Sequence, residues 1–307
     1  MLQQHCNIGG EIALSQADLR RILLIRNPTA GGWRARRFAS VLKRLEGLGC
    51  RVTVRDTAAR GDAEALSRAA TSADFDLVAV AGGDGTLSEA ANGLAASGSG
   101  LPLAVVPLGT ANVLAHEIGM PFDADGIARV LATGTPRPVY PGIANGRLFL
   151  QMAGIGFDAH AVAAVSLPLK RRLGKAAYIL AVLKVLARPF ATCRIEVDGK
   201  TFEAASAIVA KGHFYGGRFV FCPGARLEAG TLEVCLLPRT GILNFLRYLT
   251  AFGLGAVHRL SDVRVVRGRR LRIEGPTGEP VQGDGDLLTT LPLTIEVRDE
   301  PLALIYP

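Results

Sequence analysis

The stretch Val78–Leu94, "VAVAGGDGTLSEAANGL", decides the fold class of this chain, because it joins an apolar run to a helix-forming run through a glycine-rich loop. Glycine loses more backbone freedom on folding than any other residue, so Gly82, Gly83 and Gly85 indicate a backbone that approaches a partner closely. Consecutive N–H groups in such a loop, with the positive end of the following helix, are suited to binding an anion. The alternative interpretation is a tight strand-to-helix turn in which Asp84 only caps the helix.

The residues on either side of this stretch repeat the same alternation of strand and helix. The segments in chain order are the strand "RILLIR", the loop "NPTAGG", the helix "RARRFASVLKRLEGLG", the strand "CRVTVRD", a helix over residues 62–72, "FDLVAVAGG", the helix "TLSEAANGLAASG" and "LPLAVVPLGTANVLAHEIG". Strands that alternate with helices of this length predict βαβ units and a parallel sheet.

After about residue 134 short β-rich runs dominate, interrupted by helices near residues 166–187 and 241–256, which predicts an antiparallel sandwich or open barrel. The expected fold is therefore an α/β N-terminal domain with a parallel, Rossmann-like sheet and a β-rich C-terminal domain, with a cleft between them. The expected boundaries are an N-terminal extension over residues 1–20, a nucleotide-binding domain over 21–134 and a lipid-substrate domain over 135–307.

Composition narrows the partners and the compartment. The net charge of +8 favours anionic partners such as phosphates, nucleic acid or acidic membrane surfaces. The basic residues are dispersed and not interleaved with aromatics on a recognisable module, so nucleic acid is not expected. The five cysteines follow no ligand spacing and are typical of reduced thiols in the cytosol. No signal peptide and no apolar run long enough to span a membrane is expected.

Three glycine-containing loops follow predicted strands, over residues 27–32, 82–86 and 108–112. Ligands bind at the carboxyl ends of the strands in such sheets, so these loops are expected to form one site. Asn27, Thr110 and Asn112 are polar donors there, although each alone is equally typical of turn chemistry. A carboxylate beside phosphate is repulsive, so Asp84 is expected to act through Mg²⁺ or to orient a reacting hydroxyl.

The series "NPTAGG", "AGGDGTLSEAANGL", "PLGTANVLAHEIGMP", "AGIGFDA" and "GDGD" resembles the diacylglycerol kinase catalytic-domain family in order and spacing. That family includes bacterial lipid kinases and the sphingosine and ceramide kinases, and it is related to NAD kinases through GGDGT. The resemblance covers roughly residues 21–297. It implies ATP-dependent phosphorylation of a lipid hydroxyl, of a diacylglycerol or sphingoid type, with ATP in the first domain and the lipid in the second.

Carried onto this chain, the resemblance and the strand-end loops identify one set of nucleotide contacts: Asn27, Pro28, Thr29, Ala30, Gly31, Thr57, Gly82, Gly83, Asp84, Gly85, Thr86, Leu87, Ser88, Thr110 and Asn112. The late Asp-Gly-Glu of the family matches Asp284, Gly285 and Asp286 here. Asp286 is therefore the expected general base, beside Asp84 and with ATP and Mg²⁺. The alternative is that "GDGD" is only a hairpin turn.

Three positions depart from the family pattern. Asp286 is one methylene shorter than glutamate, so its carboxylate reaches roughly 1.5 Å less far. A misplacement of that size lowers the rate by about a hundredfold if nothing compensates. Val113 in "GTANV" removes a polar group near the reacting centre. Ala229 stands where bacterial relatives have an aspartate of a structural Mg²⁺ site, which leaves only carbonyls such as those of Leu227 and Thr231. No second metal site is therefore expected.

The stretch "SLPLKRRLGKAAYILAVLKVLARPF" combines the basic residues Lys170, Arg171, Arg172 and Lys175 with apolar residues at helical spacing. Such a helix suits an interface rich in anionic phospholipid, and an ordinary core-facing helix is the equally weighted alternative. We therefore expect a cytoplasmic protein that associates peripherally with the membrane and has a lipid substrate; a homodimer is left open. The rival functions are a NAD-kinase-like enzyme and a catalytically weak or inactive nucleotide- or lipid-binding protein.

Overall fold

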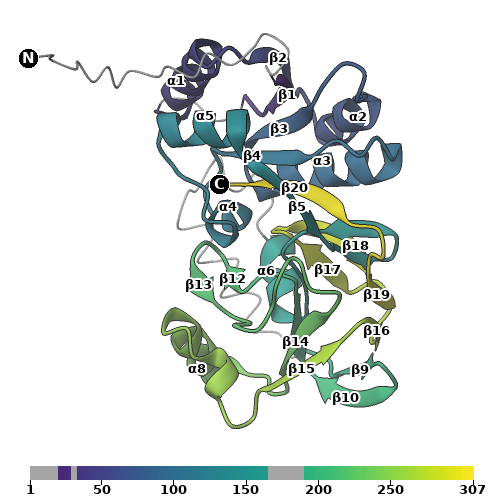
Figure 1. Cartoon of the computed structure of the whole chain (residues 1–307). Helices are drawn as coiled ribbons and strands as arrows, with labels where there is room; N and C mark the ends of the chain where they lie inside the picture. Colours follow the sequence, from purple (N-terminus) through teal and green to yellow (C-terminus); the bar gives the residue numbers. More distant parts are fainter. Residues whose placement is uncertain (1–19, 29–32, 165–189) are drawn as a thin grey trace, which may run out of the picture.

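The computed structural model describes residues 20–28, 33–164 and 190–307, which form two stacked domains (Figure 1). The predicted nucleotide contacts Thr29, Ala30 and Gly31 and the basic helix expected over 166–187 lie outside the described residues.

The first domain is built on a six-stranded sheet in the order β2-β1-β3-β4-β20-β5. Neighbouring strands from β2 to β20 run parallel, and β5 runs antiparallel to β20. The elements are β1 (Arg21–Arg26), α1 (Trp33–Gly47), β2 (Arg51–Asp56), α2 (Asp62–Ala69), β3 (Leu77–Gly82), α3 (Asp84–Ser97), β4 (Leu103–Pro107), α4 (Val113–Glu117), α5 (Ala124–Thr133), β5 (Thr135–Val139) and β20 (Leu302–Tyr306).

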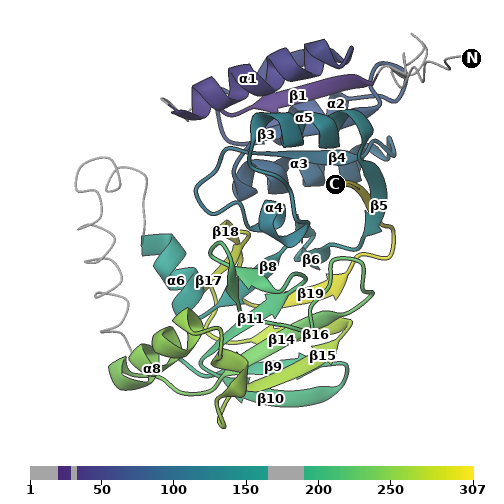
Figure 2. The same ribbon diagram turned by 60° about the vertical axis from the view of Figure 1, so that its left-hand side comes forward.

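Helices cover both faces of this sheet, with α1 beside α5 and α2 beside α3 (Figures 1 and 2). Every residue of β3 and β4 is buried, as are the four central residues of β1. A continuous apolar run is the pattern of a parallel strand that is covered on both sides, so the expected α/β domain with a parallel sheet is confirmed.

The sequence predicts that the first domain ends at residue 134. Two strands of its sheet nevertheless lie beyond that residue. β5 forms one edge of the sheet, and β20 lies between β4 and β5. Pro136 and Pro138 in β5 lack a backbone donor, and an edge strand tolerates this because one side of it needs no partner. The chain therefore enters the second domain after β5 and returns from it through β20.

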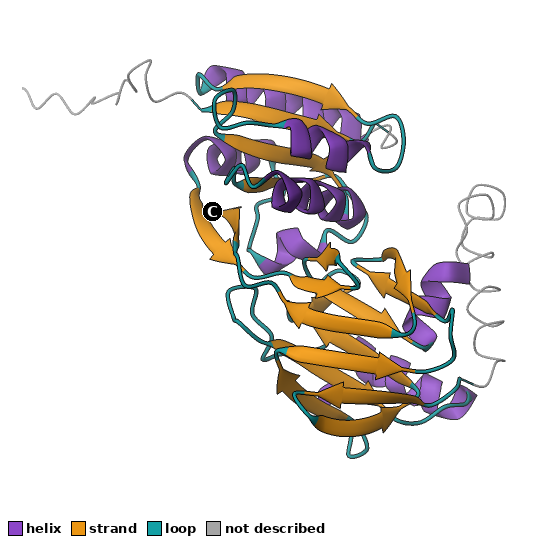
Figure 3. Ribbon diagram, turned by 90° about the vertical axis from the view of Figure 1, so that its right-hand side faces the viewer, coloured by secondary structure: helices purple, strands orange, loops and turns teal. Residues whose placement is uncertain are grey.

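The second domain contains two six-stranded sheets, in the orders β10-β9-β16-β19-β6-β7 and β15-β14-β11-β8-β17-β18, whose pairings are antiparallel (Figure 3). Its strands are β6 (Gly142–Ala144), β7 (Arg147–Phe149), β8 (Met152–Ile155), β9 (Cys193–Val197), β10 (Lys200–Ala204), β11 (Ser206–Ala210), β12 (Phe214–Tyr215), β13 (Phe219–Val220), β14 (Leu232–Leu237), β15 (Arg264–Gly268), β16 (Arg270–Glu274), β17 (Pro280–Gly283), β18 (Asp286–Thr290) and β19 (Leu293–Val297). The expected β-rich domain is confirmed as an antiparallel sandwich.

Burial follows the layers of this sandwich. β9 and β16 alternate buried and exposed residues, which is the pattern of a sheet with one face in the core. β11 is buried throughout, because its second face is covered by α6 (Phe157–Ala164), α8 (Ile242–Gly253) and the β12–β13 hairpin. The helix expected near residues 241–256 is thus present as α8, followed by a short 3-10 helix, η2 (Val257–Arg259). Figure 2 shows α6 and α8 on this outer side of the sheet.

Among the described residues, no helix has both the length and the apolar character needed to cross a membrane.

Candidate active site

Asp286 and the GGDGT loop, which are far apart in the sequence, meet where the two domains touch. Asp286 is the first residue of β18, and Gly85 lies in the first turn of α3. A β-carbon on Gly85 would overlap the Oδ2 atom of Asp286 and stand 3.4 Å from its Cγ. The absence of a side chain at Gly85 therefore makes room for a carboxylate that comes from the second domain.

The turn that presents Asp286 is held by the buried carboxylate of Asp284. The backbone N–H groups of Leu150, Gln151 and Met152 donate to it over 2.7, 2.8 and 3.1 Å. Burial raises the pKa of Asp284 to about 6, and these N–H donors oppose the rise. Asp284 has a φ of 51° and Gly285 a φ of 88°, so the backbone turns through the left-handed region before β18 begins. "GDGD" is a hairpin turn, and that turn directs Asp286 toward the first domain.

Asp84 faces the start of α4. Its Oδ1 accepts the backbone N–H of Leu114 over 3.2 Å, and burial raises its pKa. The carboxylate therefore bonds to the first turn of α4 and does not cap α3, whose N-cap is Gly83 without a side-chain bond, while the metal or hydroxyl role of Asp84 stays a prediction. In the described parts of the chain no cluster of three or more His, Cys, Asp or Glu side chains could hold a metal ion. An Mg²⁺ that keeps its phosphate ligands needs only one or two carboxylates, a demand that Asp84 and Asp286 fit.

The strand-end loops lie together at one edge of the first sheet. A β-carbon on Gly109 would stand 2.5 Å from the Cα of Gly83, so the loops after β3 and β4 pack backbone against backbone. Asn27, after β1, donates through Nδ2 to the Thr86 hydroxyl over 3.3 Å. Asn112 has a φ of 48°, and its amide bonds both the N–H and the carbonyl of Gly109, at 2.7 and 3.0 Å.

The remaining predicted nucleotide contacts surround these loops. The Thr110 hydroxyl accepts a hydrogen bond from Arg34 over 3.3 Å. Thr57 is buried at the end of β2, and its N–H donates to the carbonyl of Arg26 over 2.9 Å. Ser88 turns its hydroxyl toward the carbonyl of Leu148, at 3.5 Å. The Leu87 side chain is buried in the core, and the Ser88 side chain contacts the second domain. Pro28 is exposed.

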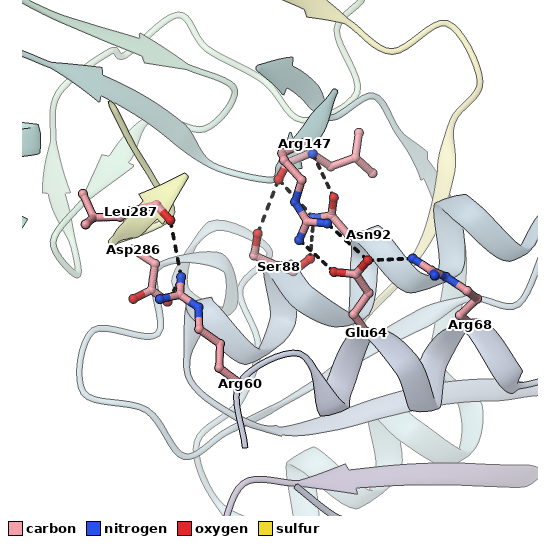
Figure 4. A network of polar contacts seen from close by, with 9 residues as sticks. Arg60, Glu64, Arg68, Ser88, Asn92, Arg147, Asp286 and Leu287 are labelled. Atoms are coloured by element: carbon pink, nitrogen blue, oxygen red, sulfur yellow. Dashed lines mark hydrogen bonds and ion pairs between the residues drawn. The ribbon is translucent and has the colours of Figure 1, made fainter. Parts of the chain in front are cut away.

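Arg60 is a site residue that the sequence did not reveal. Its Nη2 lies 4.0 Å from Oδ2 of Asp286 and donates to the carbonyl of Leu287 over 3.3 Å (Figure 4). Both side chains of the ion pair are more than half exposed, so the attraction itself is weak. Arg60 nevertheless places a positive charge beside the carboxylate. It belongs to no motif, and only its position next to "GD" after β2 could have suggested it.

A second polar network fixes the two domains beside this point (Figure 4). Asn92 on α3 bonds the backbone of Leu148 in both directions, at 3.0 and 3.2 Å, as a neighbouring strand would. Glu64 on α2 forms an ion pair with Arg147 of β7 at 2.7 Å and a second one with Arg68 on its own helix. These contacts set the separation between the nucleotide loops and β18.

Lys211 bonds to the segment around Ala229, for which the resemblance to the family raised the question of a structural metal. Its fully buried ammonium donates to the carbonyls of Ala229 and Thr231, the latter over 3.1 Å, while the carbonyl of Leu227 accepts the N–H of Tyr140. Burial lowers the pKa of Lys211 to about 8. The carbonyls that a metal would need are already bonded, so these residues do not fit a divalent cation.

A cavity of about 290 Å³ opens between α6, α8 and the second sheet of the sandwich. Aromatic side chains dominate its wall, among them Phe157, Tyr215 and Phe245. Asp158 is the buried acid in the wall: the Tyr215 hydroxyl donates to it, and burial raises its pKa. Gln282 also donates to Asp158, over 2.5 Å, and accepts the N–H of Gly285 over 3.0 Å. Gln282 therefore connects the cavity to the turn that carries Asp286.

Both domains match known family models. Residues 21–143 match the diacylglycerol kinase catalytic domain, and residues 151–306 match the YegS C-terminal NAD kinase beta sandwich-like domain. The chain belongs to the diacylglycerol kinase catalytic-domain family. Membership indicates a lipid kinase, which is a phosphotransferase, and a kinase family implies the use of ATP.

Relatives of this family match along most of their length. A diacylglycerol kinase of Bacillus subtilis is 32% identical over 86% of this chain and 88% of the relative. A Pseudomonas aeruginosa protein named "Probable lipid kinase YegS-like" is 33% identical over 94% of this chain and 95% of the relative. A solved structure of a diacylglycerol kinase from Bacillus anthracis superposes with a TM-score of 0.76 and 28% identity, over 94% and 97% of the two chains.

Proposed function

We propose that this member of the diacylglycerol kinase family transfers the γ-phosphate of ATP to the hydroxyl of a lipid, of a diacylglycerol or sphingoid type. The observation that carries the proposal is the position of Asp286 against Gly85. It puts an acid from the sandwich domain beside the glycine loop that would hold the phosphates. A phosphoryl donor and an acceptor hydroxyl held by different domains would meet at this point.

The first domain supplies the nucleotide site. The loops after β1, β3 and β4 present backbone N–H groups and hydroxyls at the carboxyl edge of a parallel sheet. The glycines Gly83 and Gly109 are packed backbone to backbone, which brings the loops after β3 and β4 together at the N-terminus of α3, where a helix favours an anion. Mg²⁺ bound to the phosphates would offset their negative charge, and Asp84 and Asp286 are the carboxylates that would hold it.

Asp286 acts as the general base in this proposal. Its side chain is 56% exposed, so a hydroxyl can approach it. The lipid O–H bond breaks and its proton moves to the Asp286 carboxylate. The hydroxyl oxygen forms a bond to the γ-phosphorus, and the bond from that phosphorus to the bridging oxygen breaks, which releases ADP. Arg60 beside Asp286 orients the carboxylate.

The cavity between α6 and α8 accommodates the apolar part of the lipid. Its aromatic wall offers apolar surface, and the hydrogen bonds of Gln282 to Asp158 in the wall and to the Asp286 turn support a lipid whose acceptor end lies toward the base. We propose that the lipid enters from an anionic membrane surface in the cytoplasm, because the chain carries a net charge of +8.

The decisive experiment incubates the protein with ATP labelled in the γ-phosphate, Mg²⁺ and a total lipid extract, and identifies the labelled lipid by mass spectrometry. Labelled lipid is the expected result, and the Asp286→Asn variant should lose it while still binding ATP. NAD and NADH serve as acceptors for the NAD-kinase-like alternative. ATP binding without transfer to any acceptor would support the catalytically inactive alternative and contradict the proposal.

A further inference from the structure

Helix α8 carries an unusual apolar face. Ile242, Leu243, Leu246 and Leu249 are between 49% and 80% exposed, and Ala251 is the one residue of the helix that is fully buried. We call the four exposed residues the α8 face. Single exposed apolar residues are ordinary on a protein surface, but four on one helix form a contiguous patch, and such patches mark interaction surfaces.

The α8 face continues into the mouth of the cavity. Phe245, Tyr248 and Phe252 lie at spacings of three and four residues on the neighbouring arc of the same helix, and all three line the cavity. Leu249 belongs to both arcs, because it lines the cavity and is 49% exposed. A molecule that covers the face therefore also covers the entrance.

Two further apolar residues extend the patch beyond the helix. Leu254, just after α8, is 78% exposed, and Phe219 on the β12–β13 hairpin is 46% exposed. The Phe219 ring packs on Phe252 with 4.9 Å between the ring centroids. The patch thus spans the helix and the hairpin.

Positive charges outnumber negative ones around the patch. From Val234 to Ser261 the chain contains Arg239, Arg247 and Arg259 and no acidic residue. Asp262, the acid that follows, is already paired with Arg247 and lies 3.3 Å from Arg239. Three arginines against the one acid Asp262 leave a net positive charge beside the apolar strip, which is complementary to the interface of a bilayer that contains anionic lipid.

We propose that the α8 face docks on the surface of an anionic lipid bilayer and seats the cavity mouth in the headgroup region. The inference rests on the proposed lipid-kinase function and specifies the surface through which the acceptor is taken up. Lipid can then pass from the bilayer into the cavity past Leu249 without crossing water. Docking by this face requires no helix that spans the membrane.

The test compares the whole protein with Leu243→Asp and with a matched control, Leu48→Asp, by sedimentation with lipid vesicles. Leu243 lies outside the cavity, and Leu48 is exposed just after α1, far from α8 in sequence; both changes add the same charge. The vesicles are phosphatidylcholine alone or mixed with phosphatidylglycerol. We expect the wild type and Leu48→Asp to bind the mixed vesicles, and Leu243→Asp to bind them about tenfold more weakly, since a leucine no longer enters the interface. Equal binding by all three proteins would overturn the proposal.

Further readouts separate this inference from its rivals. Leu243→Trp should shift its fluorescence to shorter wavelength on mixed vesicles, and Leu48→Trp should not. If Leu243→Asp instead changes only the oligomeric state in size-exclusion chromatography, the face pairs two copies of the chain and the inference is wrong. Kinase activity on a short-chain lipid dispersed as monomers should be unchanged in Leu243→Asp. Vesicle docking without any kinase activity would contradict the proposed function and leave the docking surface standing.

Discussion

Oδ2 of Asp286 lies in the space that a β-carbon of Gly85 would fill. The position of this carboxylate from the second domain therefore depends on the absence of a side chain at Gly85 in the first. This contact explains the third glycine of the GGDGT loop, Gly85, as much as a bound phosphate would. An alanine there would push the carboxylate away from the nucleotide loop.

Gly85→Ala is therefore expected to lower kcat by about a hundredfold, because the general base is displaced by an ångström or more. ATP binding should change little, since the other loop residues remain in place. Steady-state kinetics with lipid and isothermal titration with ATP measure the two effects. Gly47→Ala is the matched control, because a β-carbon there meets no atom within 4 Å. Wild-type kcat in Gly85→Ala would show that the contact has no catalytic role.

Asp286→Asn should reduce phosphate transfer by about 10²- to 10⁴-fold while the nucleotide still binds, because an amide cannot accept the proton. Asp286→Glu should also reduce kcat, even though the family resemblance led us to expect a glutamate here. The aspartate already reaches Gly85, and a longer side chain has to fold away from it. Kinetics on the two variants decide the point: a Glu variant faster than the wild type would mean that Asp286 stands too far from its substrate.

Gln282→Leu is expected to lower kcat by about five- to tenfold, because two buried hydrogen bonds are lost at about 1 kcal/mol each and the Asp286 turn loosens. The KM for the lipid should change less than kcat, since Gln282 touches the cavity only through Asp158. Gln282→Glu keeps an acceptor for the N–H of Gly285 but places a second carboxyl against Asp158. Recovery of kcat in the Glu variant would locate the effect at Gly285, whereas unchanged kcat in both variants contradicts a positioning role.

Lys211→Met should lower the free energy of unfolding at pH 7 by about 2 kcal/mol, because two carbonyls of half-buried residues lose their donor. The folded-state pKa of Lys211, about 8, lies below its ordinary value of 10.5. The unfolded chain therefore binds the proton more tightly, and the stability contributed by Lys211 rises as the pH increases from about 8 to 10.5.

Urea unfolding of the wild type and Lys211→Met at neutral and alkaline pH measures this difference, with the exposed Lys200→Met as control. The gap between wild type and Lys211→Met should widen with pH. A chelator should leave the wild-type midpoint unchanged, and a chelator-induced loss of stability would mean that a metal, not the ammonium, binds the carbonyls of this segment.

Asp284 predicts a pH dependence with the opposite sign. Its folded-state pKa of about 6 lies above the ordinary 3.8, so the folded state binds the proton more tightly and stability falls as pH rises between these values. Protonation nevertheless removes an acceptor from the N–H groups that hold the turn, so kcat should fall below about pH 6. Thermal melting across this range should show the slope in the wild type and lose it in Asp284→Asn. An identical slope in both proteins contradicts this assignment.

The strands that carry the nucleotide loops could be predicted because their patterns are local. The buried apolar run of β3, which ends in Gly82 and is followed by Gly83, predicts both the strand and the turn after it. The apolar runs of β1 and β4 likewise predict those strands and the turns that follow them. The antiparallel sandwich followed from short alternating runs. The roles of the predicted contacts with ATP stay predictions.

The rest depends on contacts between distant segments, which no local pattern encodes. Nothing near Arg60 or Asn92 indicates which strand of the second domain it will meet. The departure of Ala229 from the expected family pattern could be seen in the sequence, but the buried ammonium of Lys211, just after β11, could not be paired with that segment from the sequence. Residues 302–306 form a strand of ordinary composition, and its membership in the first sheet is decided by tertiary packing.

The insertion of β20 between β4 and β5 also bears on the order in which the protein folds. The first sheet lacks an interior strand until residues 302–306 have been synthesised, although its nucleotide loops lie before residue 113. Such a non-local pairing makes folding slower than the local βαβ units alone would allow. During synthesis, the facing edges of β4 and β5 therefore stay unpaired until β20 is available. A chain truncated before Leu302 should leave these two edges exposed and should aggregate.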